Sequence, residues 1–131
     1  MKAKKLLHTR YRVNDLNKTV QFYREVLGLD EVDRKKSPRG GELVFLKAPE
    51  SAELIELCSF PNSGSVDVQP DLTHLAFEVD NLDDFGKHLA SLGLQFSDGP
   101  NPLSNGGRFA FIDAPERYEI ELIEPPPKAN H

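Results

Sequence analysis

The sequence contains an internal repeat, which restricts the fold of the chain more than any other feature does. One constant shift places His8 on His74 and Phe45 on Phe111, and a shift one residue shorter places Glu56-Leu57 on a second Glu-Leu pair. The matches run along both halves. We therefore predict a single domain, residues 1–131, made of two copies of one module at about 5–60 and 71–125.

Each copy shows the same order of predicted elements. An alternating apolar run, 6–13 in the first copy and 73–79 in the second, predicts a half-buried strand. A helix-capping residue follows, Asp15 in the first copy and Asp80 or Asn81 in the second. Apolar residues with helical spacing come next. They are Leu16, Val20, Tyr23 and Leu27 in the first copy, and Leu82, Phe85, Leu89 and Leu92 in the second. Three shorter strand-like runs close each copy, so the module is predicted to be βαβββ.

Composition and charge exclude several classes of function. The net charge is −5 and the only basic cluster is at residues 2–5, so we expect no nucleic-acid partner. No apolar run approaches the ~20 residues needed to span a bilayer, and residues 1–7 do not resemble a secretion signal, so no membrane partner is expected. Cys58 is the only cysteine, which excludes an intramolecular disulfide and favours the cytoplasm.

Strand alternation places one histidine and one glutamate of each copy on the sheet face away from the helix. These are His8 and Glu56 in the first copy, and His74 and Glu121 in the second. A single histidine or glutamate on a strand is usually solvated, but recurrence at matched positions favours a shared role. Two imidazoles and two carboxylates suit Ni²⁺, Co²⁺, Mn²⁺, Fe²⁺ or Zn²⁺. Without a thiolate among them, a closed structural zinc site is not expected.

Four further residues lie near this predicted metal site in the sequence. Arg12 and Arg10 could each bind a substrate carboxylate, or could simply lie at a solvated strand edge, which is the expectation for Arg10. Cys58 is predicted to be a buried, unreactive thiol. Phe60 could form a wall of the substrate site or belong to the core.

Several segments of the chain resemble glyoxalase I (lactoylglutathione lyase) and, more broadly, the vicinal oxygen chelate superfamily. They are residues 8–16, 22–23 with 27–28, 54–57, 74–80 and 118–124. The resemblance covers about residues 6–124. It implies an α+β fold in which the two βαβββ modules form an open, cupped mixed sheet around a metal, with the helices outside. It also implies a homodimer, with the site either within one chain or shared between subunits.

The resemblance also implies an activity. Glyoxalase I is a lyase of methylglyoxal detoxification that isomerises the hemithioacetal of methylglyoxal and glutathione to a 2-hydroxyacyl thioester through an enediolate. All four metal ligands of the bacterial type carry over, to His8, Glu56, His74 and Glu121. A histidine at the first position resembles the nickel- or cobalt-activated type rather than the zinc type, with no organic cofactor. Glu121 then becomes the expected catalytic base, with Glu56 as its partner.

The resemblance extends to the substrate site, with departures. Arg12 falls where the family has an arginine that helps to hold the glutathione carboxylate. The aromatic residue and asparagine that usually follow Glu56-Leu57 are replaced by Cys58-Ser59-Phe60. The usual glycine-containing turn before the last strand is replaced by residues 113–117. These departures leave the predicted metal ligands intact and leave the thiol cosubstrate open.

Two alternatives remain from the sequence. The first is another enzyme of the superfamily, such as a methylmalonyl-CoA epimerase-like protein, although that family usually has glutamine at the position of Glu56. The second is a non-catalytic protein that binds a small molecule. Such a protein does not need metal-ligand residue types at all four positions, which this chain has.

Overall fold

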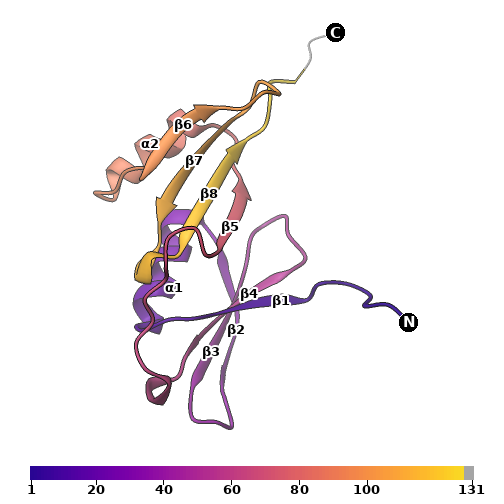
Figure 1. Cartoon of the computed structure of the whole chain (residues 1–131), viewed down its shortest axis with the longest axis vertical. Coiled ribbons are helices and arrows are strands. Elements are labelled where there is room, and N and C mark those ends of the chain that lie inside the picture. Colours follow the sequence, from indigo (N-terminus) through magenta and orange to yellow (C-terminus); the bar gives the residue numbers. More distant parts are fainter. Residues whose placement is uncertain (129–131) are drawn as a thin grey trace. The chain divides into compact units, whose positions relative to one another are not determined.

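The computed structural model describes residues 1–128, which form two compact units divided between Asp67 and Val68 (Figure 1). Each unit contains four strands and one α-helix in the order βαβββ. Short 3₁₀ turns lie at Pro61–Ser63 and Pro115–Arg117. The predicted α+β fold of two βαβββ modules is confirmed. We call the two units the first and the second module.

The first module is a four-stranded mixed sheet with one helix. Its elements are β1 (His8–Arg12), α1 (Leu16–Leu27), β2 (Asp30–Lys36), β3 (Glu42–Lys47) and β4 (Leu54–Ser59). The strand order is β1-β4-β3-β2, in which β1 runs parallel to β4 and the other neighbours are antiparallel. Helix α1 contacts β4 and β2. The first strand of the chain therefore lies next to the last strand of its module.

The second module repeats this arrangement. Its elements are β5 (His74–Glu78), α2 (Leu82–Ser91), β6 (Asp98–Pro102), β7 (Arg108–Asp113) and β8 (Glu119–Glu124). The order is β5-β8-β7-β6, and the one parallel pair joins β5 to β8. Because both modules place the first strand beside the last, residues far apart in sequence become neighbours at matched positions.

Both helices begin at capping residues that the sequence indicates. The Asp15 carboxylate accepts a hydrogen bond from the backbone N–H of Lys18 at 3.1 Å, and the Asn81 side chain accepts one from Asp84 at 2.9 Å. Asn81 rather than Asp80 is therefore the second cap. Helix α1 ends at Gly28, whose φ of 73° is a left-handed conformation that glycine adopts at little cost.

The helix-facing side of each sheet is apolar. In the first module the buried apolar residues include Leu16, Val20, Tyr23 and Val26 of α1, Val44 and Leu46 of β3, and Ile55 and Leu57 of β4. In the second they include Leu82 and Leu89 of α2, Ala110 and Ile112 of β7, and Ile120 and Leu122 of β8. Burial of one large aliphatic side chain contributes about 1.5–3 kcal/mol. The predicted helix stripe is wrong at Leu92, which is 40% exposed because α2 ends at Ser91.

One glycine in each module is required by close packing at the start of a strand. A Cβ atom on Gly41 would lie 2.5 Å from the Phe60 ring and 2.6 Å from the Ser59 carbonyl oxygen. A Cβ atom on Gly107 would lie 2.5 Å from the Glu124 carbonyl oxygen. Each glycine therefore lets the start of β3 or β7 approach the end of β4 or β8.

Within residues 1–128, no helix has the length and apolar character of a membrane span.

Candidate active site

The first module places His8 and Glu56 on one face of its sheet. His8 begins β1, and Glu56 lies in β4, two residues beyond Leu54, which is the register partner of His8. Because side chains alternate along a strand, Glu56 faces away from the buried Ile55 and Leu57. His8 Nε2 lies 4.0 Å from Glu56 Oε2. Parallel pairing of β1 with β4 thus brings together two predicted ligands that are far apart in the chain.

The second module makes the equivalent pair from His74 and Glu121. His74 is the register partner of Glu119, so Glu121 again lies two residues further along the neighbouring strand. His74 Nε2 lies 3.2 Å from Glu121 Oε1. We call His8 with Glu56 the first His–Glu pair and His74 with Glu121 the second.

An aromatic ring contacts each histidine in the same way, from β3 in the first module and from β7 in the second. The ring centroids of His8 and Phe45 are 5.7 Å apart with the planes at 84°. Those of His74 and Phe111 are 5.6 Å apart at 89°. Both contacts are edge-to-face, a geometry that aromatic rings favour. The internal repeat therefore preserves the support of each imidazole as well as the His–Glu pair itself.

The two carboxylates differ in their surroundings. The Glu56 side chain is 3% exposed, and the Arg10 guanidinium donates to both of its oxygens, through Nε to Oε2 and through Nη2 to Oε1. The Glu121 side chain is 20% exposed, and Ala76 stands opposite it in register, where Arg10 stands opposite Glu56. Arg10 does lie at an exposed strand edge, as expected, because β1 is the edge strand and the Arg10 side chain is 45% exposed, but its guanidinium also binds the buried Glu56. The hydrogen bonds that Arg10 donates to Glu56 raise the pKa of Arg10.

The Arg10 contact follows from the strand pairing and not from the sequence pattern. Arg10 shares a face with His8, and a parallel register that brings His8 near Glu56 also sets Arg10 directly opposite that carboxylate. Alternation alone could not reveal this contact because it gives the face of a residue and not its neighbour on the next strand.

The remaining predicted residues lie along the same end of β4. Cys58 is buried, and the loss of hydration raises the pKa of its thiol, as expected for an unreactive cysteine. Phe60 is partly exposed and lies under two guanidinium groups, those of Arg10 at 5.6 Å and Arg39 at 5.2 Å from the ring centroid. Arg12 Nη1 donates to the Gly64 carbonyl at 2.6 Å.

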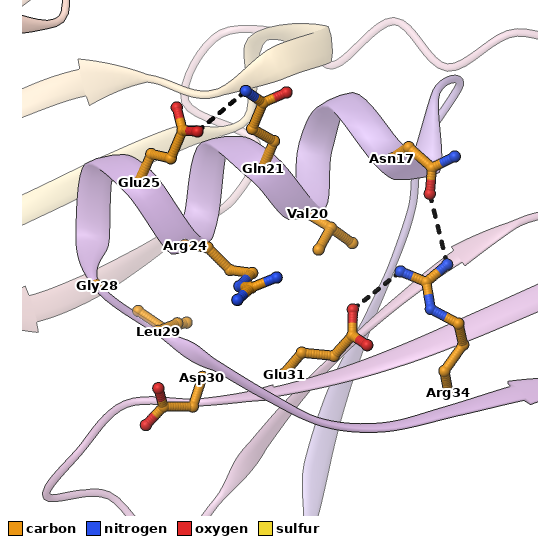
Figure 2. A pocket seen from close by; sticks show the side chains of 10 residues that line it. All are labelled: Asn17, Val20, Gln21, Arg24, Glu25, Gly28, Leu29, Asp30, Glu31 and Arg34. Atoms are coloured by element: carbon orange, nitrogen blue, oxygen red, sulfur yellow. Dashed lines mark hydrogen bonds and ion pairs between the residues drawn. The ribbon is translucent and has the colours of Figure 1, made fainter.

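A separate surface cleft lies between α1 and β2 (Figure 2). Several of its polar side chains bond to one another: Arg34 donates to Glu31 at 2.9 Å and to Asn17 at 3.4 Å. Gln21 donates to Glu25 at 3.0 Å. Its lining contains no residue of either His–Glu pair. The two pairs remain the stronger candidate for chemistry.

Each module supplies one nitrogen and one oxygen donor on one face of its sheet. Within residues 1–128, no three or more His, Cys, Asp or Glu side chains come together as a group able to hold a metal ion. Each pair is thus an incomplete ligand set in the module to which it belongs. Two such pairs together would provide the donor types that a divalent transition metal favours.

Comparison with known proteins gives matches along almost the whole chain. The model of the glyoxalase/bleomycin resistance protein/dioxygenase superfamily matches residues 5–122. A lactoylglutathione lyase of Salmonella typhimurium is 33% identical over 124 residues, which cover 92% of this chain and 92% of that protein. A probable lactoylglutathione lyase of Synechocystis is 32% identical over 123 residues, which cover 91% and 94%.

A solved structure shares the fold. Glyoxalase I from Zea mays superposes with a TM-score of 0.80 at 27% sequence identity. The match covers 96% of this chain and 46% of the maize chain.

Proposed function

The chain belongs to the glyoxalase/bleomycin resistance protein/dioxygenase superfamily, and we propose that it isomerises the hemithioacetal of methylglyoxal and a glutathione-like thiol. Its full-length relatives are lactoylglutathione lyases, and the chain is a lyase of this glyoxalase I-like type. The proposed product is a 2-hydroxyacyl thioester. The reaction moves a proton between adjacent carbons, so it needs a base and a means of stabilising the enediolate formed between the two transfers.

The observation that carries this proposal is the matched pair in each module. Both His–Glu pairs have the same strand register and the same edge-to-face aromatic contact. Two separate surface histidines would have no reason to share these features. Their agreement supports one function for all four side chains.

We propose that His8, Glu56, His74 and Glu121 together hold one divalent metal ion, either within one chain or across two copies. The donor chemistry fits, because two imidazoles and two carboxylates suit Ni²⁺ or Co²⁺. When bound, such an ion supplies Lewis-acid polarisation of the substrate oxygens. Nickel or cobalt rather than zinc stays our prediction, as does the homodimer. The cytoplasm also remains a prediction.

Glu121 is the better placed of the two carboxylates to act as the base. It is more exposed than Glu56, and the residue opposite it is Ala76, which has no side-chain donor. Glu56 is bound at both oxygens by Arg10, so its carboxylate is already engaged. In the proposed reaction Glu121 takes the proton from the carbon that carries the thiol and returns it to the adjacent carbon.

Arg12 and Phe60 are the proposed substrate-binding residues. Arg12 reaches the loop after β4 through its hydrogen bond to Gly64, and Phe60 lies in the same loop. A guanidinium that reaches the loop which carries an aromatic ring suits a thiol that carries a carboxylate. The thiol itself is left to experiment, because Ser59 and Phe60 stand where the family usually has other residues.

The test is a direct assay of protein loaded separately with Ni²⁺, Co²⁺ and Zn²⁺. Substrates are methylglyoxal with glutathione, methylglyoxal with other thiols, and methylmalonyl-CoA. We expect thioester formation from a hemithioacetal, fastest with Ni²⁺ or Co²⁺, and a metal content that fits the four-ligand site. Epimerisation of methylmalonyl-CoA without thioester formation would replace this proposal with the epimerase alternative. A protein that takes up none of the three metals and turns over none of the substrates would favour the alternative of a non-catalytic binding protein.

A further inference from the structure

We propose that Arg10 is a counter-cation of Glu56 that a divalent metal must displace, so that binding of the shared ion by Glu56 is opposed by a competing cation and binding by Glu121 is not. This inference rests on the proposed function, because it requires the four residues to be metal ligands. It adds a residue that controls loading of the site without being a ligand.

The Arg10 guanidinium already uses the positions on Glu56 that a metal would need. Nε donates to Oε2 and Nη2 donates to Oε1 at 3.2 Å, so both carboxylate oxygens are engaged. Paired hydrogen bonds between a guanidinium and a carboxylate are among the stronger polar contacts in proteins. A metal ion and a guanidinium at one carboxylate would also repel each other at short range. Metal binding to Glu56 therefore competes with Arg10.

Burial makes this competition specific to Glu56. The carboxylate is 3% exposed, so water contributes little to its stabilisation, and it needs a positive partner in the folded chain. Arg10 provides that partner when no metal is present. A metal ion can take over the role, because it too compensates the buried charge.

The Arg10 guanidinium has an alternative contact, the Phe60 ring, when a metal displaces it from Glu56. The Arg10 side chain is 45% exposed, and its guanidinium already lies 5.6 Å from the centroid of the Phe60 ring. A cation over an aromatic face is favourable without the carboxylate. Arg10 can thus leave Glu56 by a side-chain rotation, and no strand has to separate.

The second module provides the natural control for this argument. Ala76 occupies the register position that Arg10 occupies in the first module, opposite Glu121 instead of Glu56. Ala76 cannot donate a side-chain hydrogen bond, so it does not compete for the carboxylate. The two pairs have the same ligands and differ in the residue opposite the glutamate.

The test is the Ni²⁺ affinity of the full chain, measured at fixed pH by competition with a coloured chelator. The variants are Arg10→Met, the matched charge control Arg39→Met, and the reciprocal variant Ala76→Arg. Arg39 contacts the same Phe60 ring from the β2–β3 loop. We expect Arg10→Met to bind Ni²⁺ about tenfold more tightly than the original chain and Ala76→Arg about tenfold more weakly. Arg39→Met should change the affinity by less than about twofold, because surface charges are screened.

The outcomes separate this inference from the proposed function. If the original chain binds Ni²⁺ and both Arg10→Met and Ala76→Arg bind it equally well, Arg10 does not compete and only this inference is wrong. If Arg39→Met strengthens Ni²⁺ binding as much as Arg10→Met does, the gain comes from the loss of a positive charge in general and not from competition at Glu56, and the inference is again wrong. If neither the original chain nor any variant binds a divalent metal, both proposals fail. Should Arg10→Met not fold, as judged by circular dichroism, the Ala76→Arg result decides alone.

Discussion

The two modules share a sheet order, a strand register and a His–Glu pair, yet they place arginine at different points. In the first module Arg10 of the edge strand β1 binds the glutamate of the pair, on the neighbouring strand β4. In the second, Arg108 binds Glu124 at the end of β8 and leaves the pair without a guanidinium opposite it. The repeat has thus kept the positions of the proposed ligands while their electrostatic surroundings have diverged. Strand pairing fixes where a ligand lies, and single substitutions on the neighbouring strand decide how available it is.

The largest expected difference between the modules concerns the two glutamates. Glu121→Gln should lower turnover of the hemithioacetal by about 10²–10⁴-fold, the usual contribution of a general base. Glu56→Gln should reduce turnover less, because the Glu56 side chain is 3% exposed and the Glu121 side chain is 20% exposed, so Glu121 is the more accessible carboxylate. Steady-state rates at saturating Ni²⁺ or Co²⁺ measure both effects, with metal content determined for each variant.

The metal content separates loss of the base from loss of the ion. A Glu121→Gln protein that keeps its metal and loses turnover supports Glu121 as the base. Equal rates for Glu121→Gln and the original chain would contradict this role. A larger loss with Glu56→Gln would reverse the assignment and make Glu56 the base.

The next comparison tests whether the modules share their packing at the matched glycines. Gly41→Ala and Gly107→Ala should each destabilise the fold by about 2–3 kcal/mol, because a Cβ atom would lie 2.5 Å from existing atoms. Urea unfolding measures the loss. Gly64→Ala is a useful control, because a Cβ atom there meets no atom within 4 Å, so its cost comes only from its φ of 84°. A neutral Gly107→Ala would mean that β7 can move away from β8 without cost.

A smaller effect is expected for the Arg10–Glu56 contact as a contribution to stability. A double-mutant cycle with Arg10→Met and Glu56→Gln, in metal-free protein, should give a coupling energy of about 1–2 kcal/mol. The value is modest because Arg10 is 45% exposed and solvent screens part of the interaction. Saturating Ni²⁺ should reduce the coupling, since the ion replaces Arg10 as the partner of Glu56. Coupling that metal leaves unchanged would mean that the two interactions do not compete.

These predictions depend on features that the sequence reveals unequally. The repeat, the caps at Asp15 and Asn81 and the alternation in β4 and β8 were sufficient to predict two βαβββ modules. They were also sufficient to put each histidine on the same sheet face as its glutamate. These features are local or periodic, so a linear sequence records them directly.

The contact between Arg10 and Glu56 is of another kind. It depends on which residues stand opposite each other on strands that are separated by α1, β2 and β3. Alternation assigned Arg10 to the correct face, but only the parallel register places it on the carboxylate. The burial of Glu56 was equally hidden, because its position in the strand pattern is the same as that of the more exposed Glu121.

The smallest predicted effect concerns the acid stability of the second module. Arg108 hydrogen bonds first, and then the backbone N–H of Leu82, lower the pKa of Glu124 from an ordinary value of 4.5 to about 2. Because the folded pKa is the lower one, the stabilisation is complete above about pH 4.5 and is lost as the pH falls towards about 2. Glu124→Gln should therefore lower Tm by a few degrees at neutral pH and flatten its dependence between these values. Arg108→Met should weaken the same dependence, since it removes the main donor.

The first module supplies a control for this prediction. Ser59 stands at the position that matches Glu124, so Ser59→Ala should leave the acid dependence intact. An unchanged acid slope in Glu124→Gln would show that the Arg108 contact does not contribute to folding.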